Sequence, residues 1–339
     1  MNYGESTQNI SKSLIEKECD YISDISEVEI IDFKAKSFPK DETETYFNLV
    51  VEITKSVFFI MISQLSSFLL DTINIGFIGS FGDHDLLTAI GLGAFINTLI
   101  CTIPIIGWNG GIDVLCSNAF GAKNFKLIGI YTCICREVLF AYFFLISVPL
   151  LLISHKFYAL VGQSEEIIQL ASEFNIIFIV AGFFYLNFEI LKRYIQSMEY
   201  YNVSTVISIF TTTLHFFISY IFIIHYEMKL IGAGIAICFT YFLNWMILLI
   251  IIQFFLDIDK KSYFYYCEEM FDFTYLKTFL NFGVKSFALF FLEALAFEII
   301  VFFASTLKSY YMSANVCIYN FMLIIYSVSF SLNMSACNY

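Results

Sequence analysis

The sequence predicts an all-α membrane protein, a polytopic bundle of about eight transmembrane helices. Of its 339 residues, 59% are hydrophobic and 14% are charged, whereas typical soluble domains have about 45–50% and about 25%. Apolar runs of about 20 residues or more recur along the chain, and such a run crosses a bilayer core of about 30 Å as a helix. Backbone groups in lipid must satisfy one another, so these runs are expected to be helical.

The amino-terminal residues differ sharply from the rest of the chain. Residues 1–49 contain 11 acidic residues and 5 lysines, a net charge of −6 out of −12 for the whole chain. Residues 1–48 are therefore expected to form an acidic cytoplasmic tail that is disordered or weakly helical. Nothing in this charge balance suggests nucleic-acid binding.

Eight apolar runs follow the tail. We expect spans at about 52–79, 86–115, 127–153, 167–188, 203–225, 230–256, 284–307 and 312–335. The longest polar break, rich in Asp, Lys, Tyr and Glu, predicts a cytoplasmic linker at residues 257–280.

Basic residues in the short loops predict the orientation in the membrane. If the tail is cytoplasmic, seven basic residues fall on the inside and three on the outside. The inside set is Lys123, Lys126, Lys192, Arg193, Lys260, Lys261 and Lys277, and the outside set is Lys156, Lys229 and Lys308. This excess fits the positive-inside rule with a cytoplasmic amino terminus.

Two carboxylates lie in the middle of the seventh apolar run. Glu293 and Glu298 would sit deep in the bilayer, where an acidic side chain costs about 2.5–3.5 kcal/mol on insertion scales. Five helical residues separate them by about 140° around the axis and about 7.5 Å along it, so they cannot both point into one narrow cavity. They predict a proton-binding or cation-binding pair with divided roles. The alternative is a buried glutamate that hydrogen-bonds to a neighbouring helix for packing.

Several other polar residues and glycines in the spans invite a structural or a functional interpretation. Asp71 in the first span is either paired or functional. Asp113 and Arg136 are expected to form a structural ion pair between helices, and Gly107, Gly110 and Gly111 to allow close packing or a bend. His215 is expected to be a hydrogen-bonded interior histidine rather than a proton relay. The scattered cysteines read as packing residues, with no metal site.

One stretch resembles a known family signature. Residues 111–136 read G-I-D-V-L-C-S-N-A-F-G-A-K-N-F-K-L-I-G-I-Y-T-C-I-C-R. They are similar to the signature of the multidrug and toxic compound extrusion (MATE) family, in which an acid, Leu-Cys, Asn or Gln, Gly-Ala, Gly-x-Tyr and Arg recur in this order. Three further pieces fit the family: Arg193-Tyr194-Ile195-Gln196, residues 232–236 with His215 and Trp245, and Leu292-Glu293-Ala294-Leu295-Ala296-Phe297-Glu298.

The resemblance implies an antiporter and not an enzyme. Such transporters export organic cations or weakly basic xenobiotics in exchange for H⁺ or Na⁺, by alternating access of two six-helix lobes. By this comparison Glu293 is the leading candidate to bind the substrate or a proton in the second lobe, with Glu298 beside it and Asp71 as the corresponding acid of the first lobe. Asn74, Asp113, Arg136 and His215 would support these three. No cofactor is expected beyond the coupling ion. The expected partners are small organic cations and the lipid bilayer, in the plasma membrane or a vacuolar or endosomal membrane.

The chain departs from the family pattern in three places. Ala294 and Leu295 replace a pair of tryptophans, the first span has no proline, and the sequence stops after eight expected spans. Residues 49–256 would form the complete first lobe and residues 281–339 only the first two helices of the second. The chain is therefore expected to be truncated after the eighth span. Two alternatives stay open: a truncated non-transporting membrane protein, or a subunit whose missing helices come from a second chain. A lipid flippase is less favoured because the spans offer few basic residues for phosphate.

Overall fold

A computed structural model describes residues 42–256, 258, 262 and 268–338. The predicted tail falls almost entirely outside these residues. The chain divides into one unit of residues 1–50 and a second of residues 51–339, which contains all the packing discussed below.

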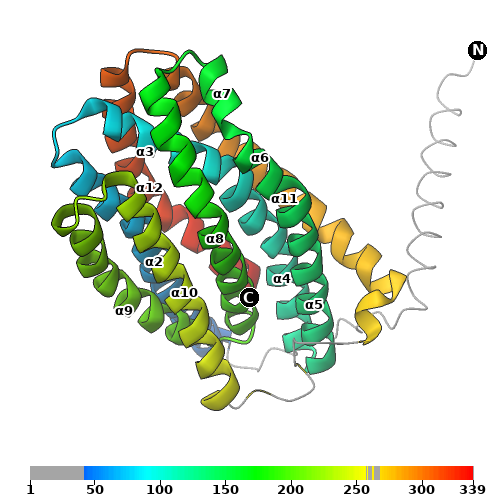
Figure 1. Cartoon of the computed structure of the whole chain (residues 1–339). Helices are drawn as coiled ribbons and strands as arrows, with labels where there is room; N and C mark the ends of the chain where they lie inside the picture. Colours follow the sequence, from blue (N-terminus) through cyan, green and yellow to red (C-terminus); the bar gives the residue numbers. More distant parts are fainter. Residues whose placement is uncertain (1–41, 257, 259–261, 263–267, 339) are drawn as a thin grey trace, which may run out of the picture. The chain divides into compact units, whose positions relative to one another are not determined.

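Helices make up most of the described residues, and Figure 1 shows how they follow one another along the chain. The helices are α2 (Glu42–Gly79), α3 (His84–Asn97), η2 (Thr98–Thr102), α4 (Ile103–Gly121), α5 (Phe125–Tyr142), η3 (Phe143–Ser147), α6 (Val148–Leu152), α7 (Ser154–Leu160), α8 (Glu165–Gln196), α9 (Tyr201–Ser219), η4 (Tyr220–His225), α10 (Lys229–Phe254), η6 (Glu268–Phe271), α11 (Phe273–Ser305) and α12 (Ser309–Asn338).

Eight helical stretches in the described part of the chain are long and apolar enough to cross a membrane. They are residues 50–79, 84–121, 125–152, 165–196, 201–225, 229–254, 273–305 and 309–336. The prediction of an all-α membrane protein with eight spans is confirmed.

Short polar side chains fix where several spans begin. Asp83 accepts hydrogen bonds from the backbone N–H groups of Asp85 and Leu86 at the start of α3. Ser164 and Asp272 cap α8 and α11 in the same way. Each cap satisfies a backbone donor that has no partner within the helix, which locates the span ends at these residues.

Three spans contain a π-helical turn. In the second and third spans the turns η2 and η3 come directly before Pro104 and Pro149, which lie in the first turn of α4 and α6. A proline inside a helix lacks the N–H that would continue the hydrogen-bond ladder and clashes with the preceding turn. The wider π turn absorbs this mismatch, so each span continues through its proline.

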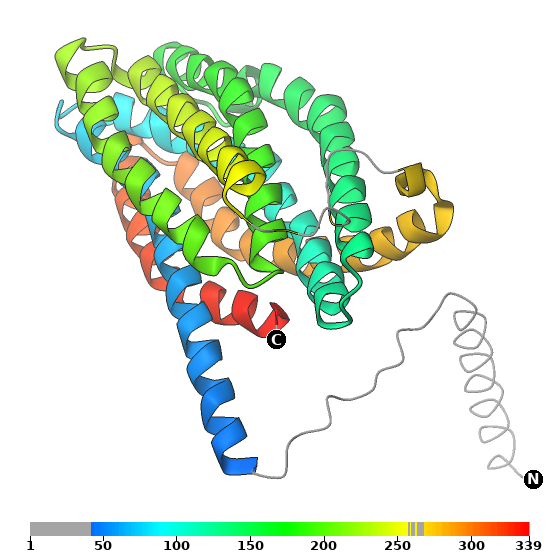
Figure 2. The ribbon, with the colours of Figure 1, turned by 90° about the horizontal axis from the view of Figure 1, so that it is seen from below.

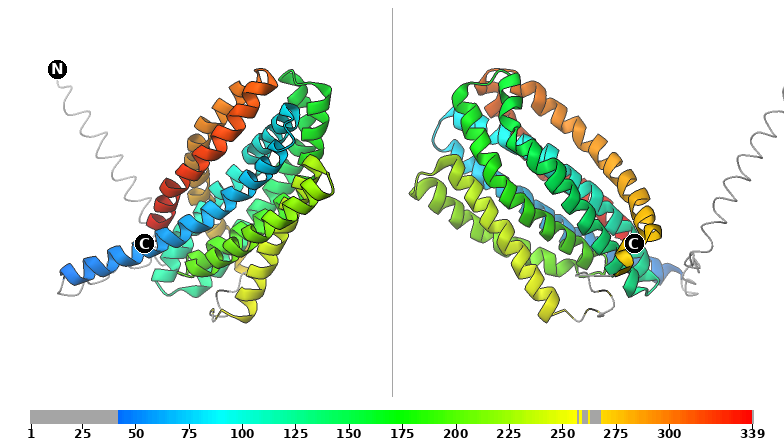
Figure 3. Two further views of the ribbon diagram at one scale, coloured as in Figure 1. Left: turned by 90° about the vertical axis from the view of Figure 1, so that its left-hand side faces the viewer. Right: turned by 45° about the vertical axis from the view of Figure 1, so that its right-hand side comes forward.

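Helix α8 lies inside the bundle, where it packs against α3, α4 and α10 (Figure 1). Helices α11 and α12 pack against one another and against α3 and α4 (Figure 3). Seen from below, the carboxyl-terminal end of α12 lies beside α2 (Figure 2), where Ser56 Oγ and Ser335 Oγ are 2.6 Å apart.

The glycines of the second span form a seam with α11. A Cβ on Gly107 would lie 2.9 Å from the Phe287 Cα, and one on Gly111 would lie 3.0 Å from the Phe279 ring. The ring of Trp108 stacks on both phenylalanines, with centroids 6.0 and 6.4 Å apart. The expectation that these glycines permit close helix packing is thus confirmed.

The structure corrects two details of the expected topology. Helix α8 runs on to Gln196, and Lys192 and Arg193 are buried in it with side chains only 1% and 2% exposed, so they do not belong to a loop. Helix α11 begins at Phe273, within the predicted linker. Without Lys192 and Arg193 the inside set falls to five basic residues against three outside; of these five, Lys277 lies in α11, and Lys260 and Lys261 lie outside the described residues. A cytoplasmic amino terminus stays a prediction.

Candidate functional site

A cavity of about 120 Å³ lies between the first six spans and the α11–α12 pair. One buried water needs about 10–15 Å³ of such a cavity, so this one has room for several waters or a small cation. Its lining comes from α2, η2, α4, α8, α10, α11 and α12, and consists of Gln64, Ser67, Phe68, Asp71, Thr98, Thr102, Ile103, Ile106, Tyr185, Glu189, Tyr241, Phe290, Ala294, Phe297, Glu298, Tyr319, Leu323, Tyr326 and Phe330.

Asp71 and Glu298 face this cavity from opposite groups of helices. Both also line an adjoining cavity of about 40 Å³, so they stand where the two hollows meet. The structure therefore brings together one predicted carboxylate from the first span and one from the seventh.

The two carboxylates differ in their hydrogen bonds. The Tyr319 hydroxyl donates to Glu298 Oε1 at 2.7 Å, whereas Glu298 Oε2 is buried without a hydrogen-bond partner. Among the residues that the structure describes, no hydrogen bond or ion pair reaches the half-buried Asp71 carboxylate. A buried charge without a partner is costly, so these oxygens are suited to hold a proton or a cation.

Glu293 does not line the cavity. It is exposed in the described chain, and its Oε1 accepts a hydrogen bond from the Tyr326 hydroxyl at 2.9 Å. The helical geometry explains this, since Glu293 lies about 140° around α11 from Glu298. In the described chain Glu293 contacts the site through Tyr326, and Glu298 is the glutamate of α11 that lines the cavity.

Aromatic rings form much of the cavity wall. Eight of the lining residues are aromatic: Phe68, Tyr185, Tyr241, Phe290, Phe297, Tyr319, Tyr326 and Phe330. Ala294 and Leu295 stand where the family that the sequence resembles has tryptophans. The eight aromatic residues nevertheless supply π faces from several helices. Such faces attract cations, most strongly where water is excluded.

Oxygen ligands for an alkali cation are also present. Thr98 and Thr102 of the π turn η2 and Gln64 of α2 line the cavity with Asp71. Carboxylate, hydroxyl and amide oxygens are the donors that hard cations prefer. A π turn at this place agrees with the frequent occurrence of such turns at functional sites.

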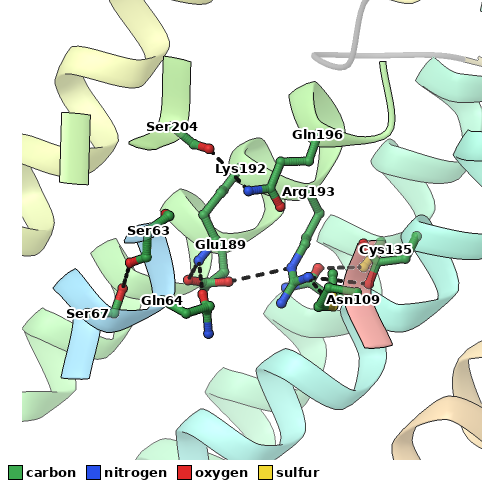
Figure 4. A network of polar contacts seen from close by, with 12 residues as sticks. Ser63, Gln64, Ser67, Asn109, Cys135, Glu189, Lys192, Arg193, Gln196 and Ser204 are labelled. Atoms are coloured by element: carbon green, nitrogen blue, oxygen red, sulfur yellow. Dashed lines mark hydrogen bonds and ion pairs between the residues drawn. The ribbon is translucent and has the colours of Figure 1, made fainter. Parts of the chain in front are cut away.

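A buried network of charges adjoins the cavity, which its members Glu189 and Gln64 also line (Figure 4). Lys192 donates to Glu189 Oε1, one turn before it in α8, and to Gln64 Oε1 of α2 at 3.0 Å. Arg193 Nε lies 3.7 Å from Glu189 Oε2, and Arg193 Nη1 lies 3.5 Å from Asp113 Oδ2 of α4.

The partner of Asp113 is thus Arg193 and not, as expected, Arg136. Arg136 instead pairs with its neighbour Glu137 at 3.0 Å, away from the cavity. Arg193 lies one helical turn after Glu189 on a helix that packs directly against α4, which brings it to Asp113.

Asn74 and His215 belong to a separate network between α2, α9 and α10. Ser219 Oγ donates to Asn74 Oδ1 at 2.8 Å, and the two ring nitrogens of His215 lie 2.7 Å from Thr240 Oγ1 and 3.1 Å from Ser219 Oγ. Both residues are fully buried, and neither lines the cavity. This environment agrees with the reading of His215 as a hydrogen-bonded interior histidine.

Sequence reasoning misses Glu189, Gln64 and the cavity tyrosines. Glu189 directly follows the predicted fourth span, next to Lys192 and Arg193, and hydropathy alone assigns the three together to the start of a polar loop. Their spacing is the available signal, because residues three and four apart on a helix can pair and so remain in the membrane. Tyrosines carry no charge, and nothing in the sequence distinguishes the cavity tyrosines among the 22 of the chain.

Comparison with known proteins points to one family. The MatE family model matches residues 57–221. Protein DETOXIFICATION 7 of Arabidopsis thaliana is 29% identical over 196 residues, which cover 56% of this chain and 38% of that protein. Protein DETOXIFICATION 14 of the same plant is 25% identical over 254 residues, covering 74% and 51%. These matches support membership of the MATE family, whose model covers just under half of the chain.

Solved MATE structures share its fold. The eukaryotic MATE transporter AtDTX14 aligns with a TM-score of 0.72 and 24% identity, over 85% of this chain and 65% of that one. The Vibrio cholerae MATE transporter VcmN aligns with the same TM-score and 16% identity, over 85% and 64%. The chain is an integral membrane protein that spans about half or less of the length of these two plant relatives.

Proposed function

We propose that this chain acts in secondary antiport, exporting organic cations or weakly basic xenobiotics in exchange for H⁺ or Na⁺. The observation that carries the proposal is the cavity in which Asp71 and Glu298 meet from the two groups of helices. Asp71, Glu298 and the aromatic wall would bind the substrate, and Thr98, Thr102 and Gln64 would complete a site for the coupling ion.

Exchange follows from competition at these carboxylates. A carboxylate in a medium of low dielectric constant binds one positive companion strongly, whether a proton, Na⁺ or an organic cation. Two ligands that compete for it lower each other's affinity by the same factor. Binding of the coupling ion on one side of the membrane therefore promotes release of the substrate there.

Alternating access requires that the cavity open to each side in turn. In this structure α12 contacts the first six spans near both of its own ends. At one end Ser56 meets Ser335, and at the other Thr88 Oγ1 donates to the Ser309 carbonyl at 3.0 Å. Rocking of the α11–α12 pair against the first six spans would break one set of contacts and keep the other.

The proposal also covers the substrate partners, the membrane and the orientation of the chain. The substrate partners are small organic cations, and the membrane is the plasma membrane or a vacuolar or endosomal membrane with the amino terminus in the cytoplasm. Only 11% of the most apolar stretch of α11 and 22% of that of α12 are buried within the chain, the lowest fractions among the eight spans. These free faces also suit the alternative function, a non-transporting subunit that pairs with a second chain.

Transport by the reconstituted chain tests the proposal. Proteoliposomes with an imposed pH or Na⁺ gradient are expected to accumulate radiolabelled tetraethylammonium, whereas Asp71→Asn reduces the uptake to that of protein-free vesicles. Asn keeps the shape of Asp71 and removes the charge that would attract the cation. The matched control is Asp85→Asn, a half-buried residue of the first turn of α3 that does not line the cavity.

Folded protein without uptake in either gradient would instead favour the subunit. Uptake that is equal in Asp71→Asn and the parent would show that transport does not use this cavity.

A further inference from the structure

Arg193 belongs to the buried network of charges beside the cavity, and it also contacts α12. Arg193 Nη1 donates to the Met334 sulfur, and the guanidinium lies over the Phe330 ring at 5.9 Å from its centroid. Met334 and Phe330 are both buried. A residue of α8 thus contacts the helix that would move away when this end opens.

The ion pairs of Arg193 are incomplete in this arrangement. A charged nitrogen and a carboxylate oxygen normally approach to about 2.7–2.9 Å, but the distances to Glu189 and Asp113 are 3.7 and 3.5 Å. Three charged atoms in the network, Arg193 Nε, Glu189 Oε2 and Asp113 Oδ1, are buried without a hydrogen-bond partner. A thioether sulfur is a weak acceptor by comparison. Arg193 therefore has a contact with α12 and only long ion pairs with α4 and α8.

Glu189 connects this contact to the cavity. It lines the cavity together with Asp71, and its Oε1 is held by Lys192 while Oε2 faces Arg193 without a hydrogen bond. A cation in the cavity would attract the Glu189 carboxylate and weaken its pull on Arg193. The guanidinium would then stay with Met334 and Phe330.

The surrounding packing suits an end that opens. Met312 and Val316, near the start of α12, belong to the large hydrophobic core. Phe330 and Met334, near its end, belong to a separate small cluster with Ile60 and Tyr201. The carboxyl-terminal end of α12 is thus held by fewer apolar contacts, so a single polar contact has more influence there.

We propose that Arg193 is a latch between α8 and α12, that Glu189 pulls the latch open, and that a cation in the cavity closes it by competing for Glu189. The proposal rests on the proposed function for the identity of the ligand. Arg193 and Glu189 act here as positioning residues for the opening of the cavity. Closure at this end when the cavity is filled is the order of events that export toward the other end requires.

Labelling of a buried cysteine measures the latch. Ser56→Cys, placed at the contact with Ser335, reacts with a hydrophilic maleimide only when this end is open, so its rate reports the open population. Labelling of the parent chain gives the background from the native cysteines. Thr88→Cys, at the opposite contact, is the matched control for the other end.

The two test substitutions are expected to change this rate in opposite directions. Met334→Leu keeps the volume but removes the acceptor on α12, so Arg193 turns to Glu189 and Asp113, and labelling of Ser56→Cys rises about fivefold, as the loss of one ordinary hydrogen bond implies. Glu189→Gln removes the pull on Arg193, so labelling falls and tetraethylammonium no longer changes it. In the otherwise unsubstituted chain tetraethylammonium lowers the labelling. Thr88→Cys shows the reverse changes.

A purely structural role would give a different result. If both substitutions raised labelling, they would merely loosen the packing, and the latch would be refuted; unchanged rates would refute it as well. If Glu189→Gln fails to fold, Met334→Leu still tests the latch. In that variant the labelling of Ser56→Cys must rise, and its response to tetraethylammonium must shrink.

Tetraethylammonium uptake separates the two proposals. Opposite shifts in a chain without uptake would support the latch and overturn the proposed function. Uptake of tetraethylammonium without any change in the labelling rate would support the proposed function and overturn the latch.

Discussion

The two glutamates of α11 lie five residues apart and have different surroundings. Glu298 is 3% exposed and joins Asp71 in the cavity, whereas Glu293 faces away and is bonded to Tyr326. Their depth in the span could be predicted from hydropathy. Which of them faces the cavity could not, because the answer depends on how α11 is rotated against α4, and that rotation is set by the contacts of Gly107 and Gly111.

This difference gives a prediction for single substitutions. Glu298→Gln is expected to abolish gradient-driven uptake of tetraethylammonium, because it removes the charge from the cavity while keeping the Tyr319 contact possible. Glu293→Gln is expected to keep most of the uptake, because it changes only the contact with Tyr326. Initial rates in proteoliposomes measure both. The reverse ranking would return the cation-binding role to Glu293.

His215 gives a second prediction at this scale. Glutamine can both donate and accept hydrogen bonds, so His215→Gln can still bridge Thr240 and Ser219, but it does not take up a proton at neutral pH. We expect His215→Gln to retain proton-driven uptake. His215→Leu removes the hydrogen bonds to both hydroxyls, although Ser219 still donates to Asn74 and Thr240 to the Ala236 carbonyl. It is expected to lose about 1 kcal/mol of stability per lost hydrogen bond, measured by thermal unfolding in detergent.

The exposed His155 provides the control, since His155→Leu breaks no buried network. Loss of proton-driven uptake in a well-folded His215→Gln chain would identify a proton relay instead.

Among the elements, the spans were predictable and the buried charges were not. Hydropathy locates all eight spans, and the glycines indicate close packing. A hydropathy window penalises a charge wherever its partner lies, so it assigns the end of α8 to a loop although Lys192 and Arg193 have partners on α2 and α4. Pairing between helices distant in sequence cannot be seen in a local window.

The seam between α4 and α11 can be tested by a single methyl group. Gly107→Ala places a Cβ 2.9 Å from the Phe287 Cα, a backbone atom that cannot turn away. We expect a loss of about 1–3 kcal/mol, the usual cost of overpacking, seen as a lower midpoint of thermal unfolding. Gly76→Ala is the matched control, since nothing lies within 4 Å of its Cβ, and it is expected to be neutral or slightly stabilising. Equal midpoints for the two variants would show that the seam tolerates extra volume.

At the scale of the whole molecule, the first six spans and the α11–α12 pair enclose the site between them. Neither group forms the cavity alone, since Asp71 and Glu189 come from one and Glu298 and Tyr319 from the other. The lobe arrangement followed from the family resemblance, whereas the contacts of α12 near both of its ends are visible only in three dimensions. The proposed transport would therefore require relative movement of the two groups.

A reversible cross-link tests this movement. Thr88 Oγ1 and Ser313 Oγ are 3.2 Å apart, so Thr88→Cys with Ser313→Cys is expected to form a disulfide under mild oxidation. Uptake of tetraethylammonium should stop on oxidation and return with a reductant. Each single cysteine variant is the control for oxidation of the native cysteines. Full uptake by the cross-linked protein would mean that α12 and α3 do not separate during transport.

The charges around the cavity have a consequence for its ion balance. Within the described chain, Glu189 and Asp113 are compensated by Lys192 and Arg193, whereas Asp71 and Glu298 have no cationic side chain as a partner. A net charge of −2 in the membrane interior is costly. When the site is shielded from water, it is therefore expected to hold two positive equivalents: two protons, one proton with one monovalent cation, two monovalent cations, or one dication. Under the proposed antiport, a monovalent substrate that leaves the site would be replaced charge for charge, so these two side chains would set the exchange stoichiometry.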